Sequence, residues 1–289
     1  MIVDPVFRLG RVHVGFTGLP LPLRSDSFLP QFLSEEAADI SLDIYQDVDG
    51  TIPAPLIYEN AFYRIYASNG QIWAENSAHG TLGTWGYSIL HYDRVKPRLQ
   101  LLSPTHACTL DQVISGMMME SLLLAREHAL LHASVIEICG GALLFTAPSG
   151  TGKSTQAELW RRSRGAVIRN GDRALLHFEN GRAIVSGLPY AGTSGICEQF
   201  DLPIHAVVVL CRGKENRAEE LRPTEAVKCL LNQIALQPWH REDVQAALSL
   251  AARLTQCVPV LRLACLPDER AVDCLERSLK WNKPQRPGC

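Results

Sequence analysis

FTAPSGTGKST, residues Phe145 to Thr155, is the most informative segment of this chain. The segment 147–154 meets every position of the phosphate-loop pattern G-x-x-x-x-G-K-[ST] except the first, where Ala147 replaces glycine. Gly150 and Gly152 let backbone N–H groups turn inward around phosphate oxygens, and the N-terminus of the helix beyond them adds donors and its dipole. The pattern therefore predicts phosphate binding within an α/β fold; the alternative is an ordinary strand–turn–helix junction.

The residues of this loop have distinct predicted roles. Lys153 would reach the β- and γ-phosphates of ATP, and the hydroxyl of Ser154 would bind Mg²⁺. ATP and Mg²⁺ are therefore the expected cofactors. The predicted ATP-binding residues are Ser149, Gly150, Thr151, Gly152, Lys153, Ser154 and Thr155.

The composition of the chain excludes several classes of protein. Its 289 residues are enough for one large or two ordinary domains, and a chain of this size buries roughly 75% of its unfolded surface. Hydrophobic residues make up 46% and charged residues 20%, and the formal net charge is −2. This balance favours neither disorder nor attraction to nucleic acid or anionic lipid, so neither nucleic acid nor a membrane is an expected partner.

Cysteine usage and the N-terminal sequence indicate the compartment. The nine cysteines are odd in number, scattered and never spaced as C-x-x-C, which argues against a disulfide framework and a zinc site. The first residues lack the basic and apolar regions of a signal peptide, and no uncharged apolar run reaches the ~18 residues of a membrane span. We therefore expect a soluble cytoplasmic protein.

The sequence pattern changes from strands to helices near residue 108. Before it, six short stretches with turn residues between them predict strands, and the pattern from Thr109 to about Leu131 predicts a helix. We predict a β-rich N-terminal domain at 1–107, a possible peptide-recognition module, and an α/β catalytic domain at 108–289. The predicted strand stretches are VFRLGRVHVGF, ADISLDIYQDV, AFYRIYAS, QIWAENSA, GYSILHYD and PRLQLLS.

The second domain is predicted to contain β-hairpins around the phosphate loop. ASVIEI and ALLFTA flank the turn at 139–141, a helix follows from Ser154 to about Ser163 and ends at Gly165, and ENG joins two further strands. Ras-like and ABC-type NTPases would instead alternate strands with crossover helices. Further on, we predict helices at 224–235, 242–255 and 268–279 and a strand at 258–265.

Asp172 and His132 are the candidate catalytic residues beside the loop. Asp172, in RNGDRALL, follows a strand, where a metal ligand or a catalytic base would lie, but Asn170-Gly171 is also a strong turn signal. His132 begins the hairpin strand, where a lone histidine is more often structural than functional. The residues alone leave both alternatives open.

Two stretches, LLHASVIEICGGALLFTAPSGTGKST and VIRNGDRALL, resemble the catalytic domain of the HPr kinase/phosphorylase family, and more closely the HPr-kinase-related proteins of biosynthetic clusters for ribosomally made peptides such as lasso peptides. The resemblance covers roughly 106–289 and is specific between His132 and Ile196. It implies an HPr-kinase/PEP-carboxykinase-like domain in which Lys153, Asp172 and His132 are catalytic, with Asp172 as base toward a serine hydroxyl. It also implies a homo-oligomer.

Gly171 stands where that family has the first residue of an Asp-Asp pair. Asp172 is then left as base, metal ligand or both, so the bifunctional kinase/phosphorylase activity is not implied. GLPYAGTSGI at 187–196 fits the peptide-cluster relatives and could hold the acceptor or a phosphate, or be a surface turn. The residues concerned are Arg173, Tyr190, Gly192, Thr193 and Ser194, with Glu198 as a further candidate metal ligand beside Ser154 and Asp172.

The function that we predict is transfer of the ATP γ-phosphate to a Ser or Thr hydroxyl of a peptide or protein, in the tailoring of a ribosomally made peptide. This step from domain to acceptor rests on analogy more than on residues. The alternatives are a kinase of a small hydroxylated metabolite, which the same residues would serve, and a non-catalytic nucleotide switch.

Overall fold

The computed structural model describes residues 4–18, 20–46, 52, 54–61, 63–69, 71–76, 88–91, 98–101, 109–116, 118–190 and 192–279. Within them the protein is mixed α/β and divides into two compact units, Met1–Leu122 and Leu123–Cys289. The predicted domain boundary at 107/108 lies outside the described residues, and the division into units falls later, after Leu122. No described helix is both long enough and apolar enough to cross a membrane.

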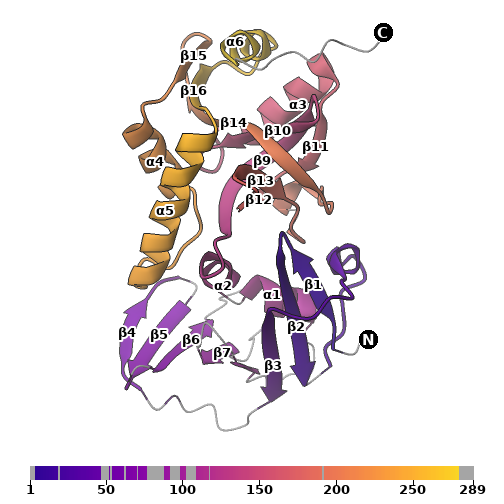
Figure 1. Ribbon diagram of the computed structural model, residues 1–289, viewed down its shortest axis with the longest axis vertical. Helices are drawn as coiled ribbons and strands as arrows, with labels where there is room; N and C mark the ends of the chain where they lie inside the picture. The colour runs from indigo at the N-terminus through magenta and orange to yellow at the C-terminus, as the bar shows by residue number, and fades with distance from the viewer. Residues whose placement is uncertain are drawn as a thin grey trace. The chain divides into compact units, whose positions relative to one another are not determined.

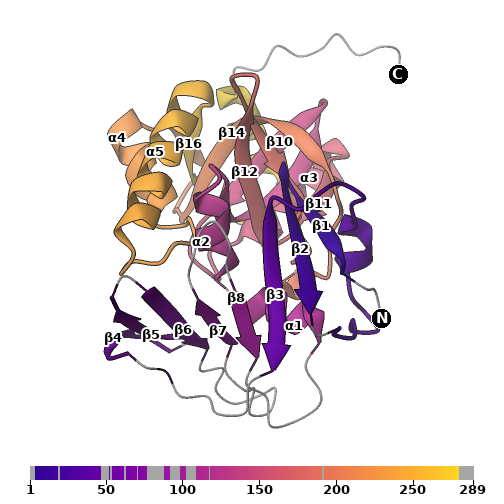
Figure 2. The same ribbon diagram turned by 60° about the horizontal axis from the view of Figure 1, so that its bottom comes forward.

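The first unit contains an eight-stranded sheet with the order β1-β2-β3-β8-β7-β6-β5-β4 (Figure 2). β3 pairs in parallel with β2 and β8, and the other pairs are antiparallel. Each of the six stretches predicted to be strands contains at least one, whereas β4 and the 3₁₀ helix η1 (Leu29–Phe32) were not predicted. The strands are β1 Val6–Leu9, β2 Val12–Gly18, β3 Ile40–Gln46, β4 Leu56–Glu59, β5 Tyr63–Ser68, β6 Gln71–Asn76, β7 Ser88–His91 and β8 Arg98–Leu101.

The prediction of one helix from Thr109 to about Leu131 is wrong. The segment forms two short helices, α1 (Leu110–Gly116) and α2 (Met119–Leu124), and strand β9 already begins at Ala129. Glu127 has φ 57°, a left-handed backbone conformation that an α-helix cannot contain, and it turns the chain into the strand. The composition of the segment favours a helix, but its last residues form the start of the long strand β9.

The second unit surrounds the phosphate-loop sequence. The hairpin β9–β10, the helix that ends before Gly165 and the hairpin β12–β13 lie where the sequence predicts them, whereas β14 and β15 were not predicted. The elements are β9 Ala129–Ile138, β10 Gly141–Thr146, α3 Lys153–Arg164, β11 Val167–Asn170, β12 Arg173–Glu179, β13 Arg182–Ser186, η2 Gly192–Ser194, β14 Asp201–Arg212, β15 Arg217–Glu220, α4 Pro223–Leu231, α5 Arg241–Cys257, β16 Val260–Cys265 and α6 Arg270–Ser278.

Strand pairing brings several chain segments to one edge of this sheet. β10 pairs antiparallel with β9 and in parallel with β14, and β14 pairs in parallel with β16. β12 and β13 connect β9 to β14 on the other side, so that β10, β9, β12, β13 and β14 close a ring of pairings. Because β10, β14 and β16 are parallel, their carboxyl ends meet at the edge where the phosphate loop begins.

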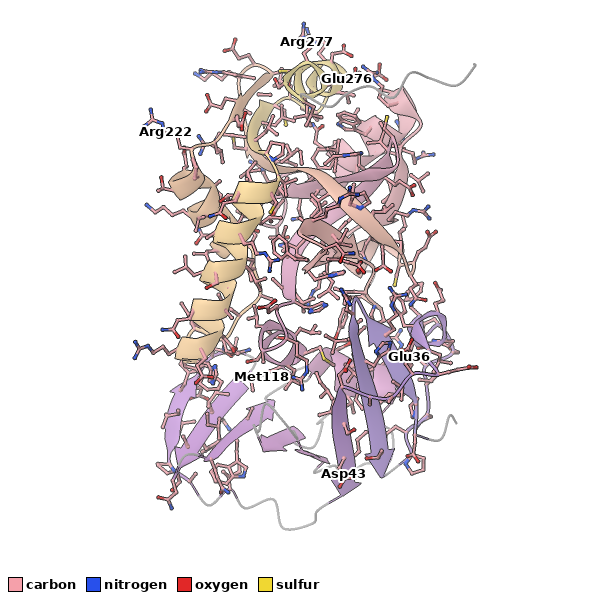
Figure 3. All side chains as sticks on the ribbon, in the orientation of Figure 1. Glu36, Asp43, Met118, Arg222, Glu276 and Arg277 are labelled. Carbon is pink, nitrogen blue, oxygen red and sulfur yellow. The ribbon has the colours of Figure 1, made fainter. Side chains whose placement is uncertain are left out.

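Helices cover the sheet on two faces: α4 and α5 lie on one side and α3 on the other (Figures 1 and 2). Alternate residues of β10 supply the two cores. Leu143 and Phe145 pack in the cluster that contains residues of α3 and α6, and Ala142 and Leu144 in the cluster that contains residues of α4 and α5. Glu276 of α6, labelled in Figure 3, accepts a hydrogen bond of 2.8 Å from the guanidinium of Arg164 at the end of α3.

Substitution of a core leucine should therefore destabilise the second unit. Leu263 of β16 is fully buried, and Leu263→Ala should lower the free energy of unfolding by about 2–5 kcal/mol. Leu248→Ala on α5, where the side chain is 46% exposed, is the matched control and should change it by less than about 0.5 kcal/mol. Urea denaturation followed by circular dichroism measures both, and equal effects would contradict the assignment of Leu263 to the core.

Candidate functional site

The loop between β10 and α3 has the backbone that its glycines predict. Gly150 has φ 74° and Gly152 has φ 114°, both in the left-handed region that strains residues with side chains. α3 begins at Lys153, directly after these glycines, and the N–H of Gln156 donates to the carbonyl of Gly152. The unpaired N–H groups of the first helical turn therefore come directly after a turn that only glycine adopts without strain.

Lys153 is held inside this loop. Its side chain is only 8% exposed, and Nζ donates to the carbonyl oxygens of Ala147, at 3.0 Å, and Pro148, at 3.5 Å. Burial lowers the pKa of Lys153 from its usual value, and the negative charge of Asp172 opposes this shift. The ammonium is therefore kept at the loop by two carbonyl dipoles and by one carboxylate from another element.

Asp172 reaches this position because of the register between β9 and β12. Arg173 is the pairing partner of His132, and the N–H of Ala133 donates to the carbonyl of Asp172 at 3.0 Å. This pairing places Nε2 of His132 3.4 Å from Oδ1 of Asp172. The three residues with predicted catalytic roles, Lys153, Asp172 and His132, are thus brought to one corner of the second unit.

The charge of His132 follows from the same neighbours. Burial lowers the pKa of its imidazole most, the ammonium of Lys153 lowers it further, and the carboxylate of Asp172 raises it. The net shift is downward, so His132 is mainly neutral at pH 7 and its 3.4 Å contact with Asp172 is not an ion pair between full charges. A neutral imidazole can accept a proton and can also orient a carboxylate.

Asn170 builds the turn that carries Asp172. Its side chain is fully buried, and Oδ1 accepts hydrogen bonds from the backbone N–H groups of Asp172, at 2.9 Å, and Arg173, at 3.0 Å. Its Nδ2 donates to the carbonyl of Tyr190 at 3.0 Å. Asp172 is therefore both a turn aspartate and a neighbour of the loop lysine, so the two interpretations left open by the sequence are compatible.

The second predicted loop lies directly on this turn. A side chain at Gly171 would place its Cβ less than 3.0 Å from Oγ and Cβ of Ser194. A Cβ at Gly192 would lie 2.7 Å from Cγ of Asp172. The Ser194 side chain thus occupies the space beside Gly171, and a close approach of two backbone segments requires glycine there. For Thr193, only the backbone is among the described residues.

Arg173 lies beside Asp172, and Tyr190 lies beside Arg173. The guanidinium of Arg173 lies 5.2 Å from the centre of the Tyr190 ring, and its Nε lies 3.6 Å from Oδ2 of Asp172. The Arg173 side chain is 44% exposed, so this positive charge is available to an anion from solvent. Arg173 and Gly192 of the predicted loop residues therefore lie beside Asp172, and Tyr190 lies beside Arg173.

Glu198 lies in a different set of contacts. Its carboxylate pairs with the guanidinium of Arg169, which also pairs with Glu137 at 2.6 Å. Ser154 is exposed at the first turn of α3, where its hydroxyl is open to a ligand. Within the part of the chain that the structure describes, no three or more His, Cys, Asp or Glu residues cluster as a metal site. Ser154 and Asp172 therefore remain candidate metal ligands, whereas the Glu198 carboxylate is paired with the guanidinium of Arg169.

One residue at the loop was not predicted. Arg212, the last residue of β14, donates from Nη2 to the carbonyl of Gly150 at 3.4 Å. The signal in the sequence is the apolar run that ends in arginine, AVVVLCR, which is typical of a buried strand with a charge at its carboxyl end. This strand is not among those predicted from the sequence, so the arginine at its end is a finding of the structure.

Comparisons with known proteins include a distant structural similarity. No protein-family model matches the chain, and no curated protein matches it. Among solved structures, the Hpr(Ser) kinase/phosphatase from Coxiella burnetii is similar with a TM-score of 0.30 and 15% sequence identity, over 52% of this chain and 92% of that chain. A TM-score this low leaves the function to be argued from the chain's own residues.

The packing of Ser194 against Gly171 predicts a compensating pair of substitutions. Gly171→Ala should lower the free energy of unfolding by about 1–3 kcal/mol, because the new methyl group overlaps the Ser194 side chain. Ser194→Gly in the same chain removes the two overlapping atoms and should restore most of the loss. Urea denaturation of both single variants and the double variant measures the coupling, and strictly additive effects would contradict this contact.

The pKa of His132 should respond to its two charged neighbours in opposite directions. A nuclear magnetic resonance titration of the wild-type ring should give a pKa below 6.5. Asp172→Asn should lower it further, and Lys153→Ala should raise it, because the first removes a negative and the second a positive charge. Since the folded-state pKa is lowered, the stabilisation from neutral His132 is present above pH 6.5 and is lost as the pH falls through the folded-state pKa. The reverse order of the two variants would show that these charges do not face His132.

Proposed function

We propose that this protein is an ATP-dependent phosphotransferase that transfers the γ-phosphoryl group to a hydroxyl. One observation carries the proposal: a buried lysine at the end of a glycine turn shares its corner with a carboxylate that contacts a neutral histidine. Phosphoryl transfer needs a cation for the phosphates and a base for the acceptor, held close together. Lys153, Asp172 and His132 are side chains of these types.

The residues of the loop fit a polyphosphate. The turn at Gly150 and Gly152 and the first turn of α3 offer backbone N–H groups to phosphate oxygens. Lys153 would exchange its two carbonyl partners for phosphate oxygens, and the exposed Ser154 hydroxyl would hold Mg²⁺. The metal, when bound, offsets negative charge on the phosphates.

In the proposed reaction Asp172 takes the proton of the acceptor hydroxyl. The acceptor oxygen forms its bond to the γ-phosphorus while the bond between that phosphorus and the bridging oxygen of ADP breaks, and ADP leaves. His132, neutral at pH 7, orients the Asp172 carboxylate through the contact of Nε2. The guanidinium of Arg173, which lies beside the same carboxylate, would bind the phosphate group of the phosphorylated product.

The acceptor that we propose is a Ser or Thr hydroxyl of a peptide, such as the precursor of a ribosomally made peptide. β4 is the terminal strand of the sheet in the first unit, and Leu56 and Ile57 on it are 47% and 54% exposed. An extended peptide can add as a further strand to such an edge. The first unit would then bind the peptide, a function that a kinase of a small metabolite would not need.

Substitution at the corner should separate nucleotide binding from transfer. Lys153→Ala should reduce ATP-dependent transfer about 10²–10³-fold, because a preorganised charge partner is lost. Asp172→Asn should reduce it about 10²–10⁴-fold with ATP affinity kept within about tenfold, since a base acts on the acceptor. Lys228→Ala, an exposed lysine on α4, is the matched control. Calorimetry with Mg²⁺·ATP and an assay for ADP measure the two quantities, and normal turnover of folded Lys153→Ala would overturn the proposal.

The acceptor class is tested by mass spectrometry. The protein is incubated with Mg²⁺·ATP and, separately, with candidate precursor peptides and with hydroxylated metabolites. Phosphate on a peptide Ser or Thr, reduced by Ile57→Lys at the β4 edge but not by Arg182→Gln elsewhere, is the expected result. Phosphate on a metabolite alone would contradict the peptide acceptor, and ATP binding without transfer to any hydroxyl would favour a nucleotide switch.

A further inference from the structure

The register of the parallel strands carries Arg212 to the phosphate loop. The last pair between β10 and β14 joins Thr146 to Val209, after which β10 enters the loop and β14 continues for three more residues. Arg212 ends the strand and pairs with Cys265 of β16. The side chain therefore leaves the sheet at the edge where the carboxyl ends of the parallel strands meet.

Alternation along β14 decides on which face of the sheet Arg212 emerges. Ala206, Val208 and Leu210 belong to the cluster that contains residues of α3, whereas Val207 belongs to the cluster under α4 and α5. Successive side chains of a strand point to opposite faces, so Arg212 lies on the α3 face with the even-numbered residues. That is the face on which the helix after the phosphate loop begins.

The contact that Arg212 makes agrees with this placement. Its Nη2 donates to the carbonyl of Gly150 at 3.4 Å, and within the described residues this is the one hydrogen bond of the Arg212 side chain. A guanidinium has five N–H donors and a permanent positive charge, so most of its donor capacity faces solvent beside the loop. A long, exposed hydrogen bond of this kind contributes little to stability by itself.

We infer that Arg212 is a phosphate-binding residue of the loop, supplied by the end of the neighbouring strand. This inference rests on the proposed binding of a polyphosphate by the loop. The Arg212 guanidinium contacts the carbonyl of Gly150, whereas Lys153 donates to the carbonyls of Ala147 and Pro148, so the two cations contact different residues of the loop. Lys153 and Arg212 then bind the bound phosphates as two separate cations, and Arg212 requires no second protein chain to provide it.

Inorganic pyrophosphate tests whether Arg212 binds phosphate, because it carries the negative charge of a polyphosphate but has no nucleobase. The alternative roles are a contact with the nucleobase and a contact that only fastens the loop. Calorimetry with Mg²⁺·pyrophosphate and with Mg²⁺·ATP is carried out on the full chain with Arg212→Ala, Arg212→Gln, Arg212→Lys and the control Arg182→Gln. We expect both ligands to bind about 10- to 100-fold more weakly to Arg212→Ala, the loss that one charge-assisted contact represents. Arg182, at the β12–β13 turn, should give no change.

Arg212→Gln tests whether the residue only fastens the loop. Glutamine can still donate to the carbonyl of Gly150 but has no charge, so it should bind pyrophosphate as weakly as the alanine variant, while Arg212→Lys recovers part of the affinity. Full affinity in Arg212→Gln would overturn the inference in favour of a fastening role. Loss of ATP affinity with unchanged pyrophosphate affinity would overturn it in favour of contact with the base.

The wild-type chain and Lys153→Ala distinguish failure of this inference from failure of the proposed function. If the wild-type chain binds neither ligand, the proposed function is wrong and the inference falls with it. If the wild-type chain binds both, Lys153→Ala binds neither and Arg212→Ala binds both normally, the loop is a phosphate site and Arg212 alone has been misassigned. Circular dichroism and thermal denaturation of each variant show that the chain remains folded.

Discussion

The buried ammonium of Lys153 is the constraint on which the second unit depends. A charge that is taken out of water is costly unless dipoles or an opposite charge compensate for it, and here two loop carbonyls and the carboxylate of Asp172 do so. Each compensating group comes from a different part of the topology: the carbonyls from the end of β10, the carboxylate from the start of β12. The long strand β9 pairs with both, so it fixes the distance between them.

Local patterns in the sequence predicted the elements around the loop but not the pairing that assembles the corner. The glycines, the lysine and the terminal Gly165 define the loop and α3, because turn and cap preferences act over a few residues. The contact between His132 and Asp172 depends instead on the register of β9 against β12, which no local pattern specifies. The helix predicted to about Leu131 failed for the same reason, since strand pairing overrode a helical composition.

Arg212 and Ser194 show two further limits of the sequence. Arg212 belongs to a strand that the sequence did not predict, and its parallel register with β10 shows that it ends beside the loop. Ser194 was considered as part of a loop over the acceptor, whereas the structure also gives it a packing role against Gly171. A carboxylate at residue 171 would overlap that serine, so the glycine is a requirement of the close approach. Among the described residues, Asp172 is the carboxylate that contacts His132 at the corner, and the mechanism that we propose therefore uses a single base.

A crystal structure with Mg²⁺ and a non-hydrolysable ATP analogue would show whether the loop and Asp172 form one phosphoryl-transfer site. We expect that the phosphates lie against the backbone N–H groups of 150–155, that Nζ of Lys153 leaves the carbonyl of Ala147 for a phosphate oxygen, and that the terminal phosphate faces Asp172. A nucleotide bound elsewhere, or a Lys153 that keeps both carbonyl partners while the nucleotide is bound, would contradict it.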